Sequence, residues 1–158
     1  MIEEYPEIAL ERFDKANIWI KYIIIKIKKF LKDDILEVGA GCGSFTKSYM
    51  KKFESITLTD MDKNSFSLLQ KVFSNEKKIQ VLKCNTKDIE KKFNTLLYFN
   101  VLEHIKDDKL EIKHALDRLN TGGHLIILVP AHQKIYSKLD KAVGHYKRYE
   151  IDFFKQNK

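Results

Sequence analysis

The chain has 158 residues, a length typical of one folded domain. Hydrophobic residues make up 44% of it and charged residues 32%, the composition of a soluble globular protein. The net charge of +7 comes mainly from lysines spread along the chain, some of them in pairs, and the only arginines are Arg12, Arg118 and Arg148. Nucleic-acid surfaces favour arginine forks and interleaved aromatic side chains, so we expect no specific nucleic-acid partner.

The first residues and the cysteines indicate the compartment. Residues 1–4 are acidic where a secretory signal needs a basic region. Cys42 and Cys84 lack metal-ligand spacing, and on the predicted sheet they would lie two strand spacings apart, roughly 9–10 Å, beyond disulfide reach. We therefore expect reduced thiols and a cytoplasmic protein.

Residues 8–31 have the apolar pattern of a helix, with Ile23 to Ile25 as its most apolar stretch. Lys21, Lys26 and Lys28 interrupt that stretch, so a membrane span is not predicted. We expect this helix to pack at the edge of a sheet. An interfacial helix with weak membrane-surface contact is the alternative.

The run from Ile35 to the third of its glycines joins a strand pattern to glycines at alternate positions: Gly39, Gly41 and Gly43. A buried strand that turns sharply into a helix while its backbone meets a ligand needs residues without a Cβ atom. A second β-rich run ends in Asp60, whose carboxylate would reach the ribose hydroxyls of a nucleoside from a neighbouring strand. The two motifs predict a nucleoside cofactor site, and a glycine turn without a ligand is the alternative.

The rest of the chain alternates between strand and helix patterns. Strands are predicted over 34–39, 55–60, 79–84, 95–101 and 123–129, and helices over 44–52, 63–73 and 107–119. This alternation predicts an α/β fold, a Rossmann-like doubly wound, mostly parallel sheet with helices on both faces. Right-handed crossovers and a switch point beside the first strand predict the strand order 3-2-1-4-5.

The glycine spacing distinguishes two kinds of nucleoside site. A nicotinamide-binding fingerprint requires Gly or Ala where Ser44 stands, whereas this chain has a G-x-G-x-G series preceded by Glu37. The arrangement resembles motif I of the class I S-adenosylmethionine (SAM)-dependent methyltransferases. The resemblance implies SAM as cofactor, with Glu37 near its methionine end, the glycines beneath it and Asp60 at the ribose. It also implies cofactor contacts from the flanking residues Ala40 and Met61.

The resemblance covers nearly the whole chain. Leu82 to Ile89 looks like the segment after strand three, where the family has an acidic residue and then a small one against the adenine. Asn85 replaces the acid, and its amide can still meet the adenine edge as donor and acceptor. Thr86 is the small residue. Asn100 and Val101, after strand four, are further implied cofactor contacts.

The segment Tyr98 to Ile105 resembles the strand-four motif of the family that ends in V-L-E-H. Related ubiquinone-type O-methyltransferases can hold a divalent metal here through E-x-x-E-H, but Asn100 stands at the first acidic position. Glu103 and His104 alone are too few ligands for a hard cation, so no required metal is predicted. His104 is a candidate general base, because imidazole titrates near neutral pH, and a capping or cofactor-framing role is the alternative.

The segment past strand five is dense in His, Tyr, Arg and Asp. Its V-P-A-H, L-Y-S-x-x-D and G-H-Y-x-R-Y motifs resemble a subgroup of bacterial and archaeal methyltransferases that is often encoded beside glycosyltransferases. Open α/β sheets bind ligands at this edge, so the segment is predicted to supply substrate contacts or an ordered lid. The candidates are His132, Tyr136, Asp140, His145, Arg148 and Tyr149. Of these, His132 and His145 join His104 as candidate catalytic groups.

The end of the chain departs from the family pattern. A complete class I methyltransferase has an antiparallel β6/β7 hairpin after strand five, and Ile151 to Lys158 are too few residues to form it. His124 to Val129 would then be an apolar edge strand, which favours pairing with another chain. We therefore expect a fragment or self-association through this edge.

These patterns predict one domain over residues 1–158, with a helical region over 1–32, a cofactor-binding core over 33–130 and a substrate-side segment with a truncated end over 131–158. The predicted function is SAM-dependent methyl transfer to a small molecule, a glycan or a lipid-linked acceptor. One alternative is an inactive SAM-binding subunit or remnant. A nicotinamide-dependent oxidoreductase is the third choice, because its glycine spacing does not match.

Overall fold

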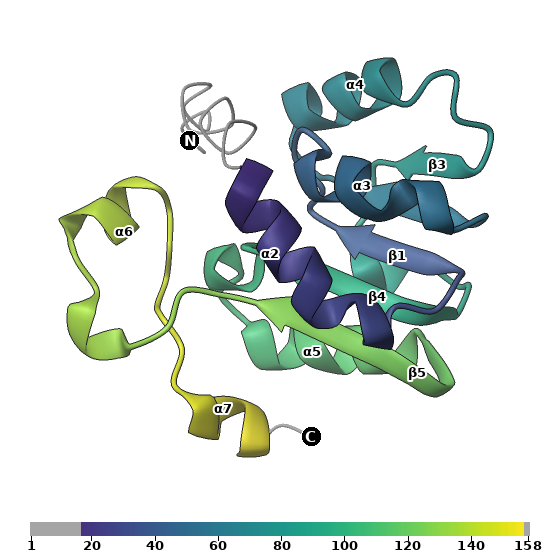
Figure 1. The fold of residues 1–158 in the computed structure, drawn as a ribbon. Coiled ribbons are helices and arrows are strands. Elements are labelled where there is room, and N and C mark those ends of the chain that lie inside the picture. The colour runs from purple at the N-terminus through teal and green to yellow at the C-terminus, as the bar shows by residue number, and fades with distance from the viewer. Residues whose placement is uncertain (1–16, 157–158) are drawn as a thin grey trace.

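The computed structural model describes residues 17–156 (Figure 1). Its strands form one sheet in the order β3-β2-β1-β4-β5, and all neighbouring pairs are parallel. The strands are β1 (Ile35–Val38), β2 (Ile56–Thr59), β3 (Ile79–Leu82), β4 (Phe93–Phe99) and β5 (Leu119–Leu128). The predicted fold class and strand order are confirmed.

The strand order reverses at β1, which pairs with β2 on one side and β4 on the other. Val38 ends β1 opposite Thr59 of β2 and Tyr98 of β4. Because parallel strands end at the same edge, the loops after these strands meet beyond this point. Such a switch point is where open α/β sheets bind ligands.

Helices and short turns connect the strands. The α-helices are α2 (Asn17–Ile27), α3 (Ser44–Tyr49), α4 (Lys63–Val72), α5 (Asp108–Asp117), α6 (Lys138–Ala142) and α7 (Ile151–Gln156). The 3-10 turns are η1 (Lys28–Phe30), η2 (Met50–Lys52), η3 (Thr86–Asp88), η4 (Leu102–His104) and η5 (Gln133–Ile135). Asp62 begins α4 by accepting a hydrogen bond from the backbone N–H of Ser65 at 2.8 Å, the side-chain cap that a helix N-terminus favours.

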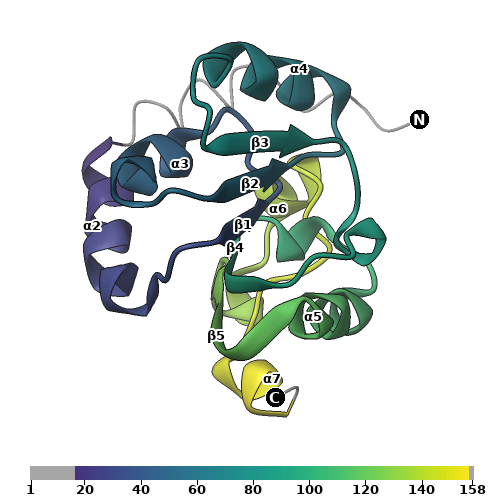
Figure 2. The same cartoon turned by 90° about the vertical axis from the view of Figure 1, so that its right-hand side faces the viewer.

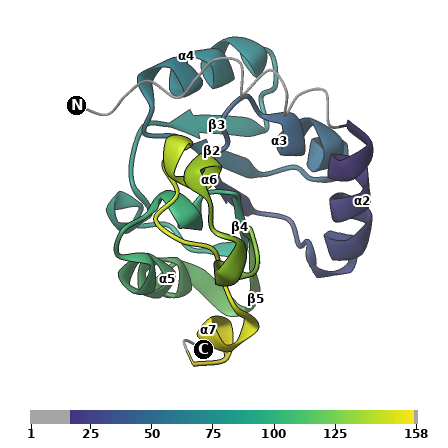
Figure 3. The same ribbon diagram turned by 90° about the vertical axis from the view of Figure 1, so that its left-hand side faces the viewer.

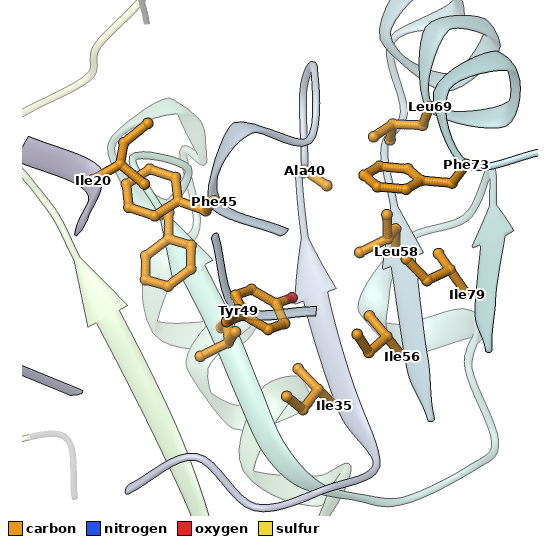
Figure 4. Packing of buried hydrophobic residues seen from close by; sticks show 12 residues of the cluster. Ile20, Ile35, Ala40, Phe45, Tyr49, Ile56, Leu58, Leu69, Phe73 and Ile79 are labelled. Carbon is orange, nitrogen blue, oxygen red and sulfur yellow. The ribbon is translucent and has the colours of Figure 1, made fainter. Parts of the chain in front are cut away.

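Two apolar layers hold the helices to the sheet. On one face, Ile20 of α2, Phe45 of α3 and Leu69 of α4 belong to a buried cluster (Figure 4). The same cluster includes Ile35 and Leu58 from the strands beneath. Figure 2 shows α2 and α3 on one side of the sheet and α5 on the other, where its apolar side chains pack on β1 and β4. Burial on both faces is why these strands are apolar almost throughout.

The isoleucines of α2 differ widely in how far they are buried. Ile20 is fully buried, whereas Ile18 is 87% exposed and Ile25 60% exposed. The predicted helix over 8–31 is described from residue 17, ends as α2 at Ile27 and continues as η1; its earlier residues lie outside the described range. Of the helices within residues 17–156, none has the length and apolar character that crossing a bilayer requires. Weak membrane-surface contact stays a prediction.

Strand β5 begins at Leu119, earlier than the predicted residue 123. Leu119 pairs with Phe93, but the next pairing joins His124 to Thr95, so the residues between them bulge out of the ladder. Gly122 lies in this bulge with φ +74°, which glycine adopts without steric strain. The strand begins earlier than predicted because Leu119, on the near side of the bulge, already pairs with β4.

After β5 the chain crosses the carboxyl ends of the strands and returns. Figure 3 views the molecule from this end, with α6 in front of the sheet. Ala131 and Tyr149 form an isolated parallel bridge, and Phe153 and Phe154 of α7 then pack beside Tyr149. Within residues 17–156, β5 has β4 as its only strand neighbour, and the elements that follow it in the chain are η5, α6 and α7.

Candidate functional site

A cavity of about 640 Å³ opens at the carboxyl ends of the central strands. This volume falls within the range of about 300–1,000 Å³ of small-molecule pockets. Its wall includes ten of the residues singled out from the sequence: Gly39, Ala40, Gly41, Asp60, Asn100, Val101, His104, Asp140, His145 and Arg148. The structure therefore joins the glycine loop, the end of β4 and the segment past β5 in one site.

Asp60 clasps the glycine loop to the end of β2. Its Oδ2 accepts a hydrogen bond from the backbone N–H of Gly41 at 2.9 Å, and its Oδ1 accepts one from Asp62 at 2.9 Å. Burial raises the pKa of Asp60, and these N–H groups offset part of that rise. A carboxylate has about four lone-pair sites, so Asp60 can also accept hydrogen bonds from a ligand.

Two of the motif glycines are required by contacts within the protein. A Cβ on Gly39 would lie 2.6 Å from Cγ2 of Val101, and one on Gly43 would lie 2.5 Å from Cε2 of Phe73. Both glycines also have positive φ, at +64° and +73°. The loop can therefore lie tightly on its neighbours, with Gly39 in the cavity wall and Gly43 buried outside it.

Glu37 lies in the core beneath the loop rather than in the cavity wall. It is 2% exposed, and its Oε2 accepts hydrogen bonds from Tyr49 Oη at 2.6 Å and Thr46 Oγ1 at 2.7 Å. Burial raises the pKa of Glu37 to about 7. Glu37 thus ties α3 to β1, and its contact with the methionine end of a cofactor stays a prediction.

The residues predicted at the adenine lie outside the cavity wall. Asn85 is exposed, and its Nδ2 donates to Asp88 Oδ2 at 3.2 Å in a capping box at η3. Thr86 is fully buried, with Oγ1 2.9 Å from Tyr98 Oη, so its side chain faces the core rather than a ligand. Met61 is 52% exposed beyond Asp60.

His132 does not join the other two candidate histidines. Its side chain is 74% exposed, and its Nδ1 lies 3.7 Å from Oε2 of Glu150. It takes no part in the cavity wall. The structure thus places His132 beside Glu150 and apart from His104 and His145, and its catalytic role stays a prediction.

Asp140 is the centre of the motifs past β5. Its Oδ1 accepts a hydrogen bond from Arg148 Nε at 2.8 Å and lies 3.0 Å from His145 Nδ1, while Oδ2 accepts one from the backbone N–H of Ser137 at 2.8 Å. Arg148 holds the pKa of Asp140 well below its usual range. An ionised Asp140 fixes Nδ1 of His145 as the protonated ring nitrogen.

The two tyrosines of these motifs order the segment. Tyr136 Oη donates to the carbonyl of His145 at 2.6 Å. Tyr149 Oη contacts the carbonyl of Leu102 at 3.0 Å and Oδ2 of Asp108 at 2.8 Å. The tyrosines therefore order the segment, and His145 and Arg148 line the cavity, where their contact with a substrate stays a prediction.

Sequence reasoning considered Glu103 only as a metal ligand and gave it no other role in the site. It is 1% exposed, and within the described residues neither of its carboxylate oxygens has a hydrogen-bond partner. Its carboxylate and the imidazoles of His104 and His145 offer ligand atoms that all lie within 4.8 Å of one another. Burial raises the pKa of Glu103 to about 7 and lowers that of His104 to about 4. The V-L-E-H motif contained Glu103, but the motif does not indicate where its side chain points.

The apolar part of the wall was also missed as a set. Phe45 stacks on Phe99 with ring centroids 4.1 Å apart, and Trp19 meets Phe45 edge-on at 5.6 Å. Leu139 and Val143, which belong to the segment past β5, also line the cavity. The spacing of aromatic residues along a helix or a strand is the same whether they fill a core or border a cavity. The sequence therefore carried no signal that separates these cavity residues from core residues.

A family model described as a methyltransferase domain matches residues 10–154. The chain belongs to this methyltransferase family. The predicted membership of the class I SAM-dependent methyltransferases, with SAM as the cofactor of the family, is confirmed.

The methyltransferase domain is similar to several known proteins. The hybrid PKS-NRPS synthetase iccA of Talaromyces variabilis is 29% identical over 114 residues, which cover 63% of this chain and 3% of the synthetase. A SAM-dependent methyltransferase from Clostridium acetobutylicum superposes with a TM-score of 0.63 at 23% identity, covering 78% of this chain and 56% of that one. The N-methyltransferase NodS from Bradyrhizobium japonicum, in complex with S-adenosylhomocysteine (SAH), superposes with a TM-score of 0.67 at 16% identity. The superposition covers 92% of this chain and 71% of NodS. The structural likenesses establish the fold.

Proposed function

We propose that the methyltransferase domain binds SAM in the cavity and transfers its methyl group to a small molecule, a glycan or a lipid-linked acceptor. The clasp between Asp60 and the N–H of Gly41 carries this proposal. It brings a carboxylate and a side-chain-free backbone to one wall at the switch point of the sheet, the arrangement that suits a nucleoside.

The residues of the cavity suit SAM. Asp60 offers acceptors to ribose hydroxyls, and the backbone at Gly39 and Gly41 permits close approach of a ligand. Phe45 and Phe99 add an apolar surface to the same cavity. The predicted contacts of the amino-acid and adenine portions, with Glu37 and Asn85, belong to this proposal as well.

Bound SAM supplies a methyl group that already carries its leaving group and a positive charge. The task of the protein is then to align the acceptor and exclude water. His104 lies in the cavity wall, and burial lowers its pKa to about 4, so its imidazole is neutral at physiological pH and can accept a proton. His145 is held in one orientation by Asp140.

Isothermal titration of the 158-residue chain with SAM, SAH and NAD tests the cofactor assignment. We expect binding of SAM and SAH and none of NAD; the reverse would favour the oxidoreductase. Transfer of a labelled methyl group from SAM to acceptor fractions then separates an active enzyme from an inactive SAM-binding subunit.

A further inference from the structure

Glu103 is a buried carboxylate that the cofactor site does not use. It is 1% exposed, it lines the cavity, and within residues 17–156 neither oxygen has a hydrogen-bond partner. A buried carboxylate is costly unless a cation or donors satisfy it. A ligand that carries a positive charge and hydrogen-bond donors would satisfy the carboxylate of Glu103.

The nearby cationic side chains are engaged elsewhere. Arg148 donates through Nε to Asp140 at 2.8 Å. Lys147 forms an ion pair with Asp108, which also accepts a hydrogen bond from Tyr149. These two cations therefore already have carboxylate partners other than Glu103.

The two imidazoles beside Glu103 present acceptors as well. Nδ1 of His145 lies 3.0 Å from Asp140 Oδ1, so we assign the proton to Nδ1 and make Nε2 an acceptor. His104 has a hydrogen bond with the backbone of Gly144 that raises its pKa, which means that the imidazole donates it. With one ring nitrogen donating, the other nitrogen of neutral His104 is an acceptor.

The spacing of the ligand atoms in this cluster leaves room for an ammonium group. The ligand atoms lie within 4.8 Å of one another. An ammonium nitrogen that donates bonds of about 2.9 Å in tetrahedral directions places its acceptors about 4.7 Å apart. The cluster suits an ammonium at its present width.

We propose that Glu103, His104 and His145 bind the amino group of the methyl acceptor, and that the acceptor is a primary aliphatic amine. The inference rests on the proposed function, because it names the acceptor class for the same cavity. A hydroxyl group donates one hydrogen bond and carries no charge, so it would leave most of these acceptors unsatisfied.

The site also accounts for the proton that the reaction must remove. A primary amine enters as an ammonium ion, whose nitrogen has no lone pair to attack a methyl group. One proton passes from that nitrogen to the carboxylate of Glu103, which becomes a neutral acid, and the N–H bonding pair becomes the lone pair of the amine. Burial favours this neutral form of Glu103, which supports the transfer.

The test is an NMR titration of the 158-residue chain with bound SAH, in which n-butylammonium chloride is the probe and n-butanol its uncharged counterpart. The imidazole nitrogen signals of His104 and His145 report on the site. We expect n-butylammonium to shift them with an affinity at least about tenfold higher than that of n-butanol. Glu103→Gln should abolish this preference, and Glu150→Gln, which changes an exposed acid outside the cavity, should retain it.

Equal affinities for n-butylammonium and n-butanol would overturn the inference, and so would an unchanged preference in Glu103→Gln. Stoichiometric binding of Zn²⁺ or Mg²⁺ that depends on Glu103 and displaces n-butylammonium would replace the amine site by a metal site. The comparison of the two probes needs only the parent chain, so it decides the matter even if Glu103→Gln fails to fold. Failure of SAH to bind would contradict the proposed function separately, because the probes can also be titrated without SAH.

Discussion

At the scale of single residues, two buried glutamates have opposite surroundings. Burial raises the pKa of both Glu37 and Glu103 to about 7. Glu37 accepts hydrogen bonds from Tyr49 and Thr46, whereas within the described residues Glu103 accepts none at its carboxylate. The first is therefore a fixed part of the core, and the second is a group that a ligand can satisfy.

Glu37 should make stability depend on pH. Its pKa is higher in the folded protein, about 7, than its ordinary value of 4.5, so the folded state binds more protons between these values. Its contribution to stability is complete below pH 4.5 and is lost as the pH rises toward 7. Relative to Glu37→Gln, the parent should lose about 3 kcal/mol across this range.

Urea unfolding of both proteins at about pH 5 and about pH 8 measures this difference. Glu54→Gln, at an exposed glutamate, is the control and should follow the parent. Equal pH dependence in Glu37→Gln and the parent would mean that folding does not raise the pKa of Glu37 above its ordinary value.

Asp60→Ala should weaken SAM binding by roughly 1–3 kcal/mol, because ribose hydroxyls would lose a charged acceptor and the Gly41 N–H would lose its partner. Isothermal titration gives the loss directly. Asp152→Ala, which removes an exposed acid of α7, serves as the control. Binding as tight as that of the parent would show that Asp60 does not contact the ribose.

At the scale of elements, the glycine loop is shaped by the helix beside it. A Cβ at Gly43 would meet Cε2 and Cζ of Phe73 at 2.5 Å and 2.7 Å, just past the end of α4. Gly43→Ala should therefore destabilise the protein by about 1–3 kcal/mol. Phe73→Leu in the same chain should recover part of the loss by removing those atoms, while the positive φ at residue 43 keeps its strain.

A double-mutant cycle by urea unfolding tests this coupling. Strict additivity of Gly43→Ala and Phe73→Leu would show that the two sites do not meet as described. The result is independent of the cofactor, because neither side chain lines the cavity.

The hydroxyl of Tyr149 links the segment after β5 to both η4 and α5. Tyr149→Phe leaves the carbonyl of Leu102 and the carboxylate of Asp108 without the Tyr149 hydroxyl, and should lower stability by about 1–3 kcal/mol. Tyr146→Phe changes a 57% exposed tyrosine in the same motif and should have little effect. Thermal unfolding of the two variants makes the comparison, and equal melting temperatures would contradict the anchoring role.

At the scale of the whole molecule, β5 is an edge strand of the described sheet. Within the described residues its only strand partner is β4, although Lys32 Nζ donates to the carbonyl of Gly122 at the bulge at 2.7 Å. Edge strands with unsatisfied backbone groups seek partners, so the 158-residue chain should self-associate as its concentration rises.

Light scattering over a concentration series measures the association, and hydrogen exchange of the outward β5 amides locates it. We expect these amides to gain protection together with the increase in mass. A monomer at every concentration would show that the edge is covered, and association without protection of β5 would place the interface elsewhere.

The sequence by itself determined the strand order, the switch point and the place of Asp60 at the end of the strand beside the glycine loop. The strands follow from local periodicity, and their order follows from the right-handed crossover rule. Parallel strands end at one edge, so the residues that follow them meet there. Only the tertiary structure decided which way the irregular segments present their side chains. Thr86 points into the core, His132 faces Glu150, and Glu103 joins a histidine far along the chain. Such directions depend on how distant segments pack against each other, and no period in the sequence encodes that.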